Sequence, residues 1–383
     1  MKFEFAVIGA TGMQGHIVAK DLLECGRSVL LCGRDKSRVE DLLKKHEKTS
    51  FAHVDLRNID KTAETIKKSG AEVVINCAEL DWNLNCLKAC IKAKVDSIDL
   101  GSEIKMTKKQ LEYDSLLKKK DLIHITGCGS IPGICNVMLR HAAEKFDTLE
   151  SVEAGFAWDS NIKKFVVPFS IKSVIEEIVE PAFLYKNGRL VKRSPLNTIC
   201  KLYRLGIGHQ HCFMIEHAEV YTFYHYFKNK GLKNAIAYGG HPHHSFETIK
   251  TLIDLGLGSK EKIKINGCKF RPIDFLTQAL KKLKIPKGYT EKENLWVKIW
   301  GTKNKKPKFA EMECLVLPLK GWEEAGSNID TGMPASIIAQ MIKDGIIEEK
   351  GSFAPEAVVP TKLFFKELRK RKMAVYENKK LIN

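Results

Sequence analysis

Short apolar runs and stretches of helical periodicity alternate along the first third of the chain. Apolar runs at residues 5–8, 28–32, 51–55, 73–77, 97–100 and 122–125 predict strands. Between them, residues 16–23, 37–45 and 84–93 carry apolar side chains at the spacing of one helix face. Strands that alternate with helices in this way form βαβ units around a parallel sheet.

From residue 149 the pattern changes to alternating apolar and polar positions. Few helical stretches separate the alternating segments, so we expect an antiparallel sheet with one covered face. The segments are residues 151–158, 216–226, 234–238, 294–301 and 310–317. Residues 170–178 and 245–255 predict helices, and helical periodicity returns at 335–344 and 360–370, before a short strand at 373–377.

The first apolar run ends in a glycine turn, Gly9-Ala10-Thr11-Gly12-Met13-Gln14-Gly15, that leads into a helix. Such a turn offers a dinucleotide a tight bend, a bare backbone and the free N–H groups of a helix N-terminus. The spacing departs from the better-known G-x-G-x-x-G, and a glycine turn without a ligand is the alternative. The candidate pyrophosphate contacts are Gly9, Thr11, Gly12, Met13, Gln14 and Gly15.

The end of the second strand predicts which coenzyme binds. An acidic residue there hydrogen-bonds the ribose of NAD, but this chain has Cys32 and Gly33, followed by Arg34. Arg34 and Ser37 can hold a 2′-phosphate, so NADP is expected in preference to NAD. Asp35 should point away or cap the helix at Ser37, and a solvated Arg34 is the alternative. Further candidates at the strand ends are Asp55, Asn76, Cys77 and Ala78.

Charge and composition exclude several classes of protein. The net charge of +17 favours anionic ligands, but the lysines are scattered and no zinc-finger or RNA-binding motif accompanies them, so no specific nucleic-acid partner is expected. No segment approaches the roughly 18 apolar residues of a membrane span, and Glu4 interrupts the only apolar run near the N-terminus. Eleven cysteines without regular spacing indicate free thiols and a cytoplasmic protein.

The order of several motifs resembles the saccharopine dehydrogenase-like family of pyridine-nucleotide enzymes. These motifs are the turn at 9–15 and residues 73–78, 99–101, 131–134, 238–241, 331–335 and 351–356. The resemblance implies an α/β fold: an N-terminal Rossmann domain with a parallel sheet (1–130), an inserted α+β substrate and dimerisation domain on an antiparallel sheet (131–328), and a C-terminal segment (329–383) returning to the first domain. It also implies a homodimer that interconverts an amine and an imine or keto compound at a small amino-acid-like substrate. Lysine 6-dehydrogenase, saccharopine dehydrogenase and carboxynorspermidine dehydrogenase are the relevant types.

Two departures leave the substrate open. Ile131 stands where saccharopine reductases carry an acidic residue, and Ala237 stands where lysine 6-dehydrogenases carry an arginine that could bind a carboxylate. A non-catalytic NADP-binding redox sensor is therefore the alternative function.

Histidines are the main candidates for proton transfer. They form two groups, His209, His211 and His217 near Cys212, and His241, His243 and His244. Since the groups are separated in sequence and nothing indicates that they meet, we predict no metal site. His241 is the predicted catalytic histidine because the resemblance retains it, with a packed histidine as the alternative. Asp99, at a strand end, is the second catalytic candidate, and a turn-forming role is its alternative.

Overall fold

The computed structural model describes residues 2–101, 103–166 and 171–383. The first domain contains a parallel sheet of seven strands in the order β17-β6-β5-β4-β1-β2-β3. Most of these strands are buried along their length, which explains their nearly continuous apolar runs. Their bounds are β1 Phe5–Ile8, β2 Val29–Gly33, β3 Thr49–His53, β4 Val73–Asn76, β5 Asp96–Asp99, β6 Ile123–Ile125 and β17 Gly351–Phe353.

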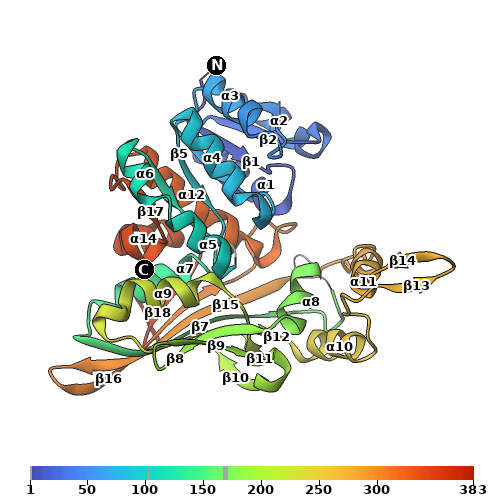
Figure 1. Cartoon of the computed structure of the whole chain (residues 1–383), viewed down its shortest axis with the longest axis vertical. Helices are drawn as coiled ribbons and strands as arrows, with labels where there is room; N and C mark the ends of the chain where they lie inside the picture. The colour runs from blue at the N-terminus through green and yellow to red at the C-terminus, as the bar shows by residue number, and fades with distance from the viewer. Residues whose placement is uncertain (1, 102, 167–170) are drawn as a thin grey trace.

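Helices connect these strands and cover the sheet (Figure 1). The helix expected at 37–45 is divided into a 3₁₀ turn, η1 (Lys36–Val39), and α2 (Glu40–Lys45). The other helices are α1 Met13–Glu24, α3 Ile59–Ser69, α4 Asn83–Ala93, α5 Ile104–Leu111 and α6 Asp114–Lys119. The predicted parallel α/β architecture of this domain is confirmed.

The second domain is built on a sheet of ten strands, which α7 (Ile134–Ala143) joins to the first domain. The main path runs β10-β11-β12-β7-β15-β16-β18-β19, with β8 and β9 beside β12. The bounds are β7 Thr148–Ser160, β8 Ala182–Lys186, β9 Arg189–Arg193, β10 Cys200–Arg204, β11 Gly208–Met214, β12 Asn234–His241, β15 Glu291–Lys303, β16 Lys306–Val316, β18 Ala374–Glu377 and β19 Lys380–Leu381.

Two sequence-based expectations for this domain are wrong. The sheet is mixed, because β12 runs parallel to β7. The long connection between them, from Asn161 to Lys233, allows the chain to return in the same direction. Residues 216–226 also do not form a strand, because Ala218–Phe227 is helix α9. Its aromatic residues favour strands locally, but Val220, Phe223 and Phe227 share one helix face and pack into the core.

The remaining helices lie at the end of the second domain away from β16 or in the C-terminal segment. They are α8 Ile171–Val179, α10 His243–Asp254, α11 Pro272–Leu280, α12 Ile329–Lys343, α13 Pro355–Val358 and α14 Thr361–Lys370, and a hairpin of β13 (Ile263–Ile265) and β14 (Cys268–Phe270) projects beside α11 (Figure 1). Ser170, where the first of these helices was expected to begin, is outside the described residues.

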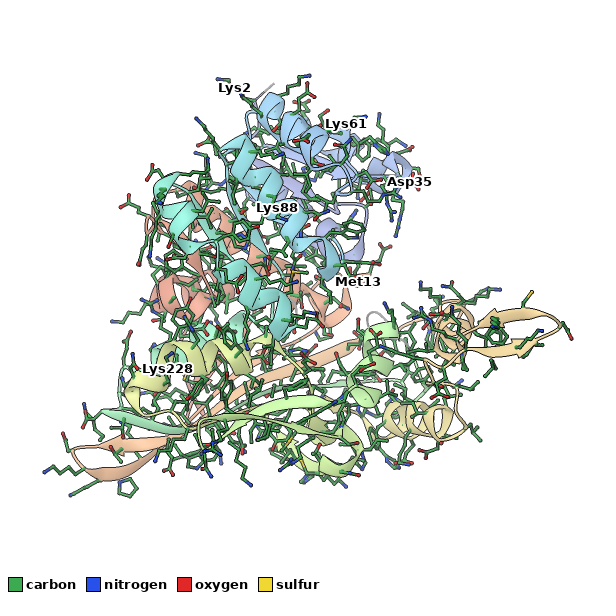
Figure 2. The ribbon with its side chains drawn as sticks, viewed as in Figure 1. Lys2, Met13, Asp35, Lys61, Lys88 and Lys228 are labelled. Atoms are coloured by element: carbon green, nitrogen blue, oxygen red, sulfur yellow. The ribbon has the colours of Figure 1, made fainter. Side chains whose placement is uncertain are left out.

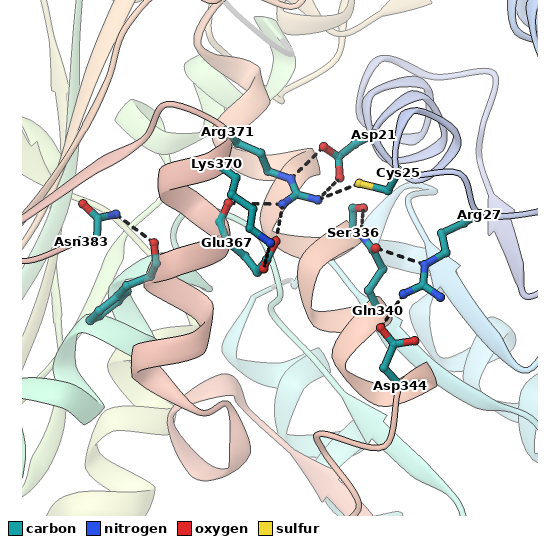
Figure 3. A network of polar contacts seen from close by, with 11 residues as sticks. Asp21, Cys25, Arg27, Ser336, Gln340, Asp344, Glu367, Lys370, Arg371 and Asn383 are labelled. Atoms are coloured by element: carbon teal, nitrogen blue, oxygen red, sulfur yellow. Dashed lines mark hydrogen bonds and ion pairs between the residues drawn. The ribbon is translucent and has the colours of Figure 1, made fainter.

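The C-terminal segment contacts both domains. β17 extends the first sheet beside β6, α12 packs on α1, and β18 pairs with β16 of the second sheet. Arg371 binds both carboxylate oxygens of Asp21 at 2.8 and 2.7 Å, and Arg27 pairs with Asp344 (Figure 3). The Arg371 pair is buried and bidentate, so it fixes α1 against the end of the chain.

Strand register determines which side chains of the second sheet face the first domain. Phe156 and Trp158 of β7 belong to the core that includes α7 and α12, whereas Ala157 and Trp296 pack on the opposite face. His241 contacts Phe156 and Trp158, and Glu293 of β15 is the cross-strand partner of Trp158. We call the side that carries Phe156, Trp158, His241 and Glu293 the inner face.

Candidate cofactor and substrate site

The glycine turn has the geometry that a dinucleotide requires. Gly9 has a positive φ of +79°, and a Cβ there would lie 2.8 Å from the amide nitrogen of Ala78. A Cβ on Gly15 would lie 2.2 Å from the carbonyl oxygen of Gly9, so glycine is needed for α1 to begin this close to β1. A Cβ on Gly12 would meet only that oxygen, at 3.4 Å. The fold therefore does not require glycine at position 12, where a bare backbone instead leaves room for a ligand.

The start of α1 offers free donors to a phosphate. Gly12 is its N-cap, no side chain caps it, and its first turn holds no acidic residue. Met13 is half exposed at the end of α1 that faces the second domain (Figure 2). Gln14 donates to Asn328 at 3.3 Å, while Thr11 fills the space beside Gly33. These residues fit the pyrophosphate of a dinucleotide.

The turn after β2, which is predicted to select the coenzyme, is at the outer edge of the first domain, where Figure 2 labels Asp35. Asp35 caps η1, accepting from the Ser37 amide at 3.0 Å and hydroxyl at 2.6 Å, as predicted. The Ser37 hydroxyl proton is thus already used, whereas the Arg34 side chain is exposed and available. Arg34 is therefore the better candidate for a 2′-phosphate.

Basic residues after β3 were missed in the sequence. Asp55 pairs with Arg57, whose hydrogen bonds and charge, with a smaller effect from Arg34, lower the pKa of Asp55. A cavity of about 270 Å³ lies beside this pair, lined also by His53, Asn58 and Lys61. Arg57 and Lys61, a few residues after the end of β3, were the available signal. Asp55 is neutralised by Arg57, so it does not repel an anionic ligand.

The candidates at the end of β4 are Asn76, Cys77 and Ala78, and the side chain of Asn76 makes its hydrogen bonds with the turn and with the start of α4. Asn76 donates to Asn83 at 2.8 Å and accepts from the Ala78 amide at 3.2 Å. Burial, and then the charge of Asp99, raise the pKa of the Cys77 thiol, so it is not a reactive thiolate. Together with Gly9, these residues present backbone rather than side-chain groups to a ligand.

Asp99 is saturated with hydrogen bonds. One of its carboxylate oxygens accepts from the Gly101 amide at 2.8 Å, the Gly127 amide at 3.1 Å and the Thr126 hydroxyl at 2.9 Å, and the other accepts from Gln110. This arrangement favours the turn-forming role over the catalytic one that its strand-end position suggested.

His241 is completely buried on the inner face. Its Nδ1 accepts from the indole N–H of Trp158 at 3.1 Å, which places the proton of a neutral ring on Nε2. That Nε2 lies 3.8 Å from a carboxylate oxygen of Glu177, too far for a hydrogen bond. Phe213 stacks on the ring with centroids 5.6 Å apart. The ring is thus held firmly while Nε2 stays available to a further group.

A second imidazole–carboxylate pair lies across Phe156 from His241. His217 Nδ1 is 3.5 Å from Glu219, and the two imidazole rings are 6.4 and 6.1 Å from the Phe156 ring. Burial lowers the pKa of His217, but Glu219 outweighs it and the pKa is raised. Among the described residues, the buried atoms here that lack a hydrogen-bond partner are Glu177 Oε2, His217 Nδ1, both Glu219 carboxylate oxygens and His241 Nε2.

Buried polar atoms without hydrogen-bond partners destabilise the folded protein, and a bound ligand can supply the missing partners. We call Glu177, His217, Glu219 and His241 the inner-face cluster. Sequence analysis missed Glu177 and Glu219, although a glutamate among the apolar residues of α9 was a usable signal for Glu219.

Two further carboxyl groups lie where the domains meet. Asp330 accepts from Thr331 at 3.1 Å, and the Thr331 and Ser130 hydroxyls are 3.0 Å apart. Burial raises the pKa of Asp330 to about 7, and burial together with Asp330 raises that of Glu293. At neutral pH this coupled pair therefore retains a proton. Asp330 brings an acidic group beside the loop in which Ile131 replaces the expected acid.

The structure corrects the argument against a metal site. His211, His243 and Glu247 come together from the two histidine groups, with their donor atoms all within 4.8 Å of one another. Nothing in the sequence indicated that β11 and α10 are neighbours. His209, His217 and His244 are not part of this trio.

Comparison with known proteins identifies the family. Residues 5–125 match the saccharopine dehydrogenase NADP binding domain and residues 129–373 match the saccharopine dehydrogenase C-terminal domain. Carboxyaminopropylagmatine dehydrogenase of Synechocystis sp. is 22% identical over 378 residues, covering 92% of each chain. Saccharopine dehydrogenase (L-Glu forming) of Saccharomyces cerevisiae shares the fold, with a TM-score of 0.77, 14% identity and full coverage of both chains.

None of the helices in the described part of the chain has the length and apolar character needed to span a membrane. The family match confirms the predicted coenzyme, NADP, and the predicted family and α/β fold class are confirmed. The chain therefore belongs to the saccharopine dehydrogenase family and is an oxidoreductase with an NADP-binding domain.

Proposed function

We propose that the protein interconverts an amine and its imine or keto partner at a cationic, amino-acid-derived substrate bound at the inner face. The observation that carries this proposal is the inner-face cluster, in which buried carboxylate and imidazole atoms lack partners. The carboxylate oxygens of Glu177 and Glu219 among them accept hydrogen bonds and carry negative charge, so they suit the N–H groups of a protonated amine.

The missing arginine supports a cationic rather than a carboxylate-rich substrate. Ala237 is buried in the core, so no arginine is available at this position to bind a carboxylate. Glu293 and Asp330 add acidic groups near the junction of the domains. The name of the relative carboxyaminopropylagmatine dehydrogenase points in the same direction.

Each part of the site has a proposed role. The turn at Gly9–Gly15 and Arg34 hold NADP, which carries the hydride when bound. The Glu177 carboxylate receives the proton at the substrate nitrogen, and His241 orients the reacting groups by donating its Nε2–H. The buried setting excludes water and strengthens these charge interactions.

Turnover on a substrate panel tests the proposal. The full-length protein is mixed with NADP⁺ and lysine, saccharopine or polyamine-like amines such as carboxynorspermidine, and nicotinamide reduction is followed by absorbance. Oxidation of a cationic amine is the expected result. Tight NADP binding without turnover on any compound would contradict the proposal and support the redox-sensor alternative.

We further propose that the protein is a cytoplasmic homodimer. All eleven cysteines are free in the structure, which suits a reducing compartment. Light scattering on the purified protein measures the assembly state, and a monomeric mass would contradict the dimer.

A further inference from the structure

We propose that His211, His243 and Glu247 bind a divalent transition-metal ion of the Zn²⁺ type, which clips helix α10 to strand β11. This site is separate from the proposed catalytic cluster, and its existence does not depend on the proposed reaction.

Two of the ligands are placed by helix geometry. His243 and Glu247 are four residues apart and therefore lie on the same face of α10, one turn from each other. His243 Nδ1 is 3.7 Å from a Glu247 carboxylate oxygen, close to the separation of two ligands on one tetrahedral ion. Both side chains are exposed, so they can adjust to an ion at little cost.

The third ligand comes from the sheet and is held more rigidly. The His211 ring stacks on Phe246 with centroids 5.2 Å apart and planes 12° apart, and it lies 5.1 Å from the His243 ring.

The donor set identifies the class of ion. Two imidazoles and one carboxylate suit Zn²⁺ and its neighbours, whereas Mg²⁺ and Ca²⁺ prefer oxygen ligands. Three protein ligands leave a fourth position for water or another ligand. The three donor atoms already lie within 4.8 Å of one another, so small side-chain rotations bring them to binding distance.

The position of the site suggests what the ion does. His211 is the cross-strand partner of His241, and Phe246 contacts Phe213, the residue that stacks on His241. α10 begins two residues after His241. An ion that links α10 to β11 therefore restricts the motion of the end of β12, which carries His241.

Metal titration tests the proposal directly. Tag-free full-length protein is stripped with a chelator and titrated with Zn²⁺ by calorimetry, and with Co²⁺ by visible absorbance. We expect one saturable site per chain, a Co²⁺ spectrum typical of nitrogen and oxygen ligands, and a higher Tm with Zn²⁺.

Variants locate the ion. H211A and E247Q should each weaken Zn²⁺ binding at least roughly 10-fold, as loss of a direct ligand requires, while the chelated proteins keep the Tm of the parent. H209A is the matched control, because His209 is on the same strand outside the trio, and it should bind normally. Absence of saturable binding, or unchanged binding in a variant lacking all three side chains, would overturn the proposal.

Discussion

The glycine turn at 9–15 and the inner-face cluster build binding sites in opposite ways. In the turn, backbone shape makes the site: glycines at positions 9 and 15 fit spaces that no Cβ could enter, and α1 begins without a cap. In the cluster, side chains from α8, α9 and β12 converge, and several of their polar atoms lack a hydrogen-bond partner. The glycine turn can be recognised in the sequence because it is local. The inner-face cluster cannot, because its residues come together only when the chain folds.

The largest effect is expected at the turn. G15A would bring a Cβ to within 2.2 Å of the Gly9 carbonyl oxygen and push α1 away from β1. We expect NADP affinity to fall at least roughly 100-fold and stability to fall by about 1–3 kcal/mol. Calorimetry and denaturant unfolding measure the two quantities.

Gly12 separates folding from binding in the same turn. G12A leaves only a 3.4 Å contact, so the apoprotein should keep its stability while NADP binding weakens. Unchanged NADP affinity in both glycine variants would mean that the turn holds no dinucleotide.

Substitution of His241 tests the inner-face cluster. H241N removes the imidazole that faces Glu177, and kcat/KM should fall roughly 100-fold with NADP affinity intact. H209N is the control on an exposed histidine. A loss below about threefold would assign His241 to packing alone.

Arg34 tests coenzyme choice, which depends on a single exposed side chain. A charged hydrogen bond is worth roughly 1.5–3 kcal/mol, so R34A should weaken NADP about 10- to 100-fold and leave NAD nearly unchanged. R189A, at an exposed arginine of the second domain, is the control. Equal Kd values for NADP and NAD in the unmutated protein would contradict this prediction.

The smallest effect is a change of stability with pH at Glu356. Burial raises its pKa from 4.5 to about 7, against hydrogen bonds from Thr222 and Asn136. The folded state thus keeps a proton that the unfolded state releases, and stability falls as pH rises through this window. E356Q cannot titrate, so the loss between about pH 5 and pH 8 should shrink by on the order of 2 kcal/mol. Denaturant unfolding at both pH values measures it, with E47Q as the exposed control, and an unchanged pH slope would contradict the shift.

These contrasts explain what the sequence could predict. Periodicity identified six strands of the first sheet, because most of them are short, buried and joined by local crossovers, but it missed β17, which comes from the C-terminal segment. It misassigned residues 216–226 as a strand where α9 forms, because tertiary packing overrides the strand preference of aromatic residues. Periodicity also could not show that β12 runs parallel to β7.

The candidate site divides along the same line. The glycines and Arg34 could be proposed from the sequence because their neighbours in sequence are also their neighbours in space. Glu177, Glu219 and the meeting of His211 with His243 were missed because they depend on contacts between distant segments.

The central claim, that the inner face binds a cationic amine, is tested most directly at Glu177. The measurement is the KM of the best amine substrate for E177Q. E176Q is the control, because Glu176 is the adjacent glutamate and pairs with Lys260 at 3.2 Å. Losing a charged hydrogen bond should raise the KM of E177Q at least roughly 10-fold while NADP affinity and the KM of E176Q stay unchanged. Equal KM values for E177Q, E176Q and the unmutated protein would contradict the account.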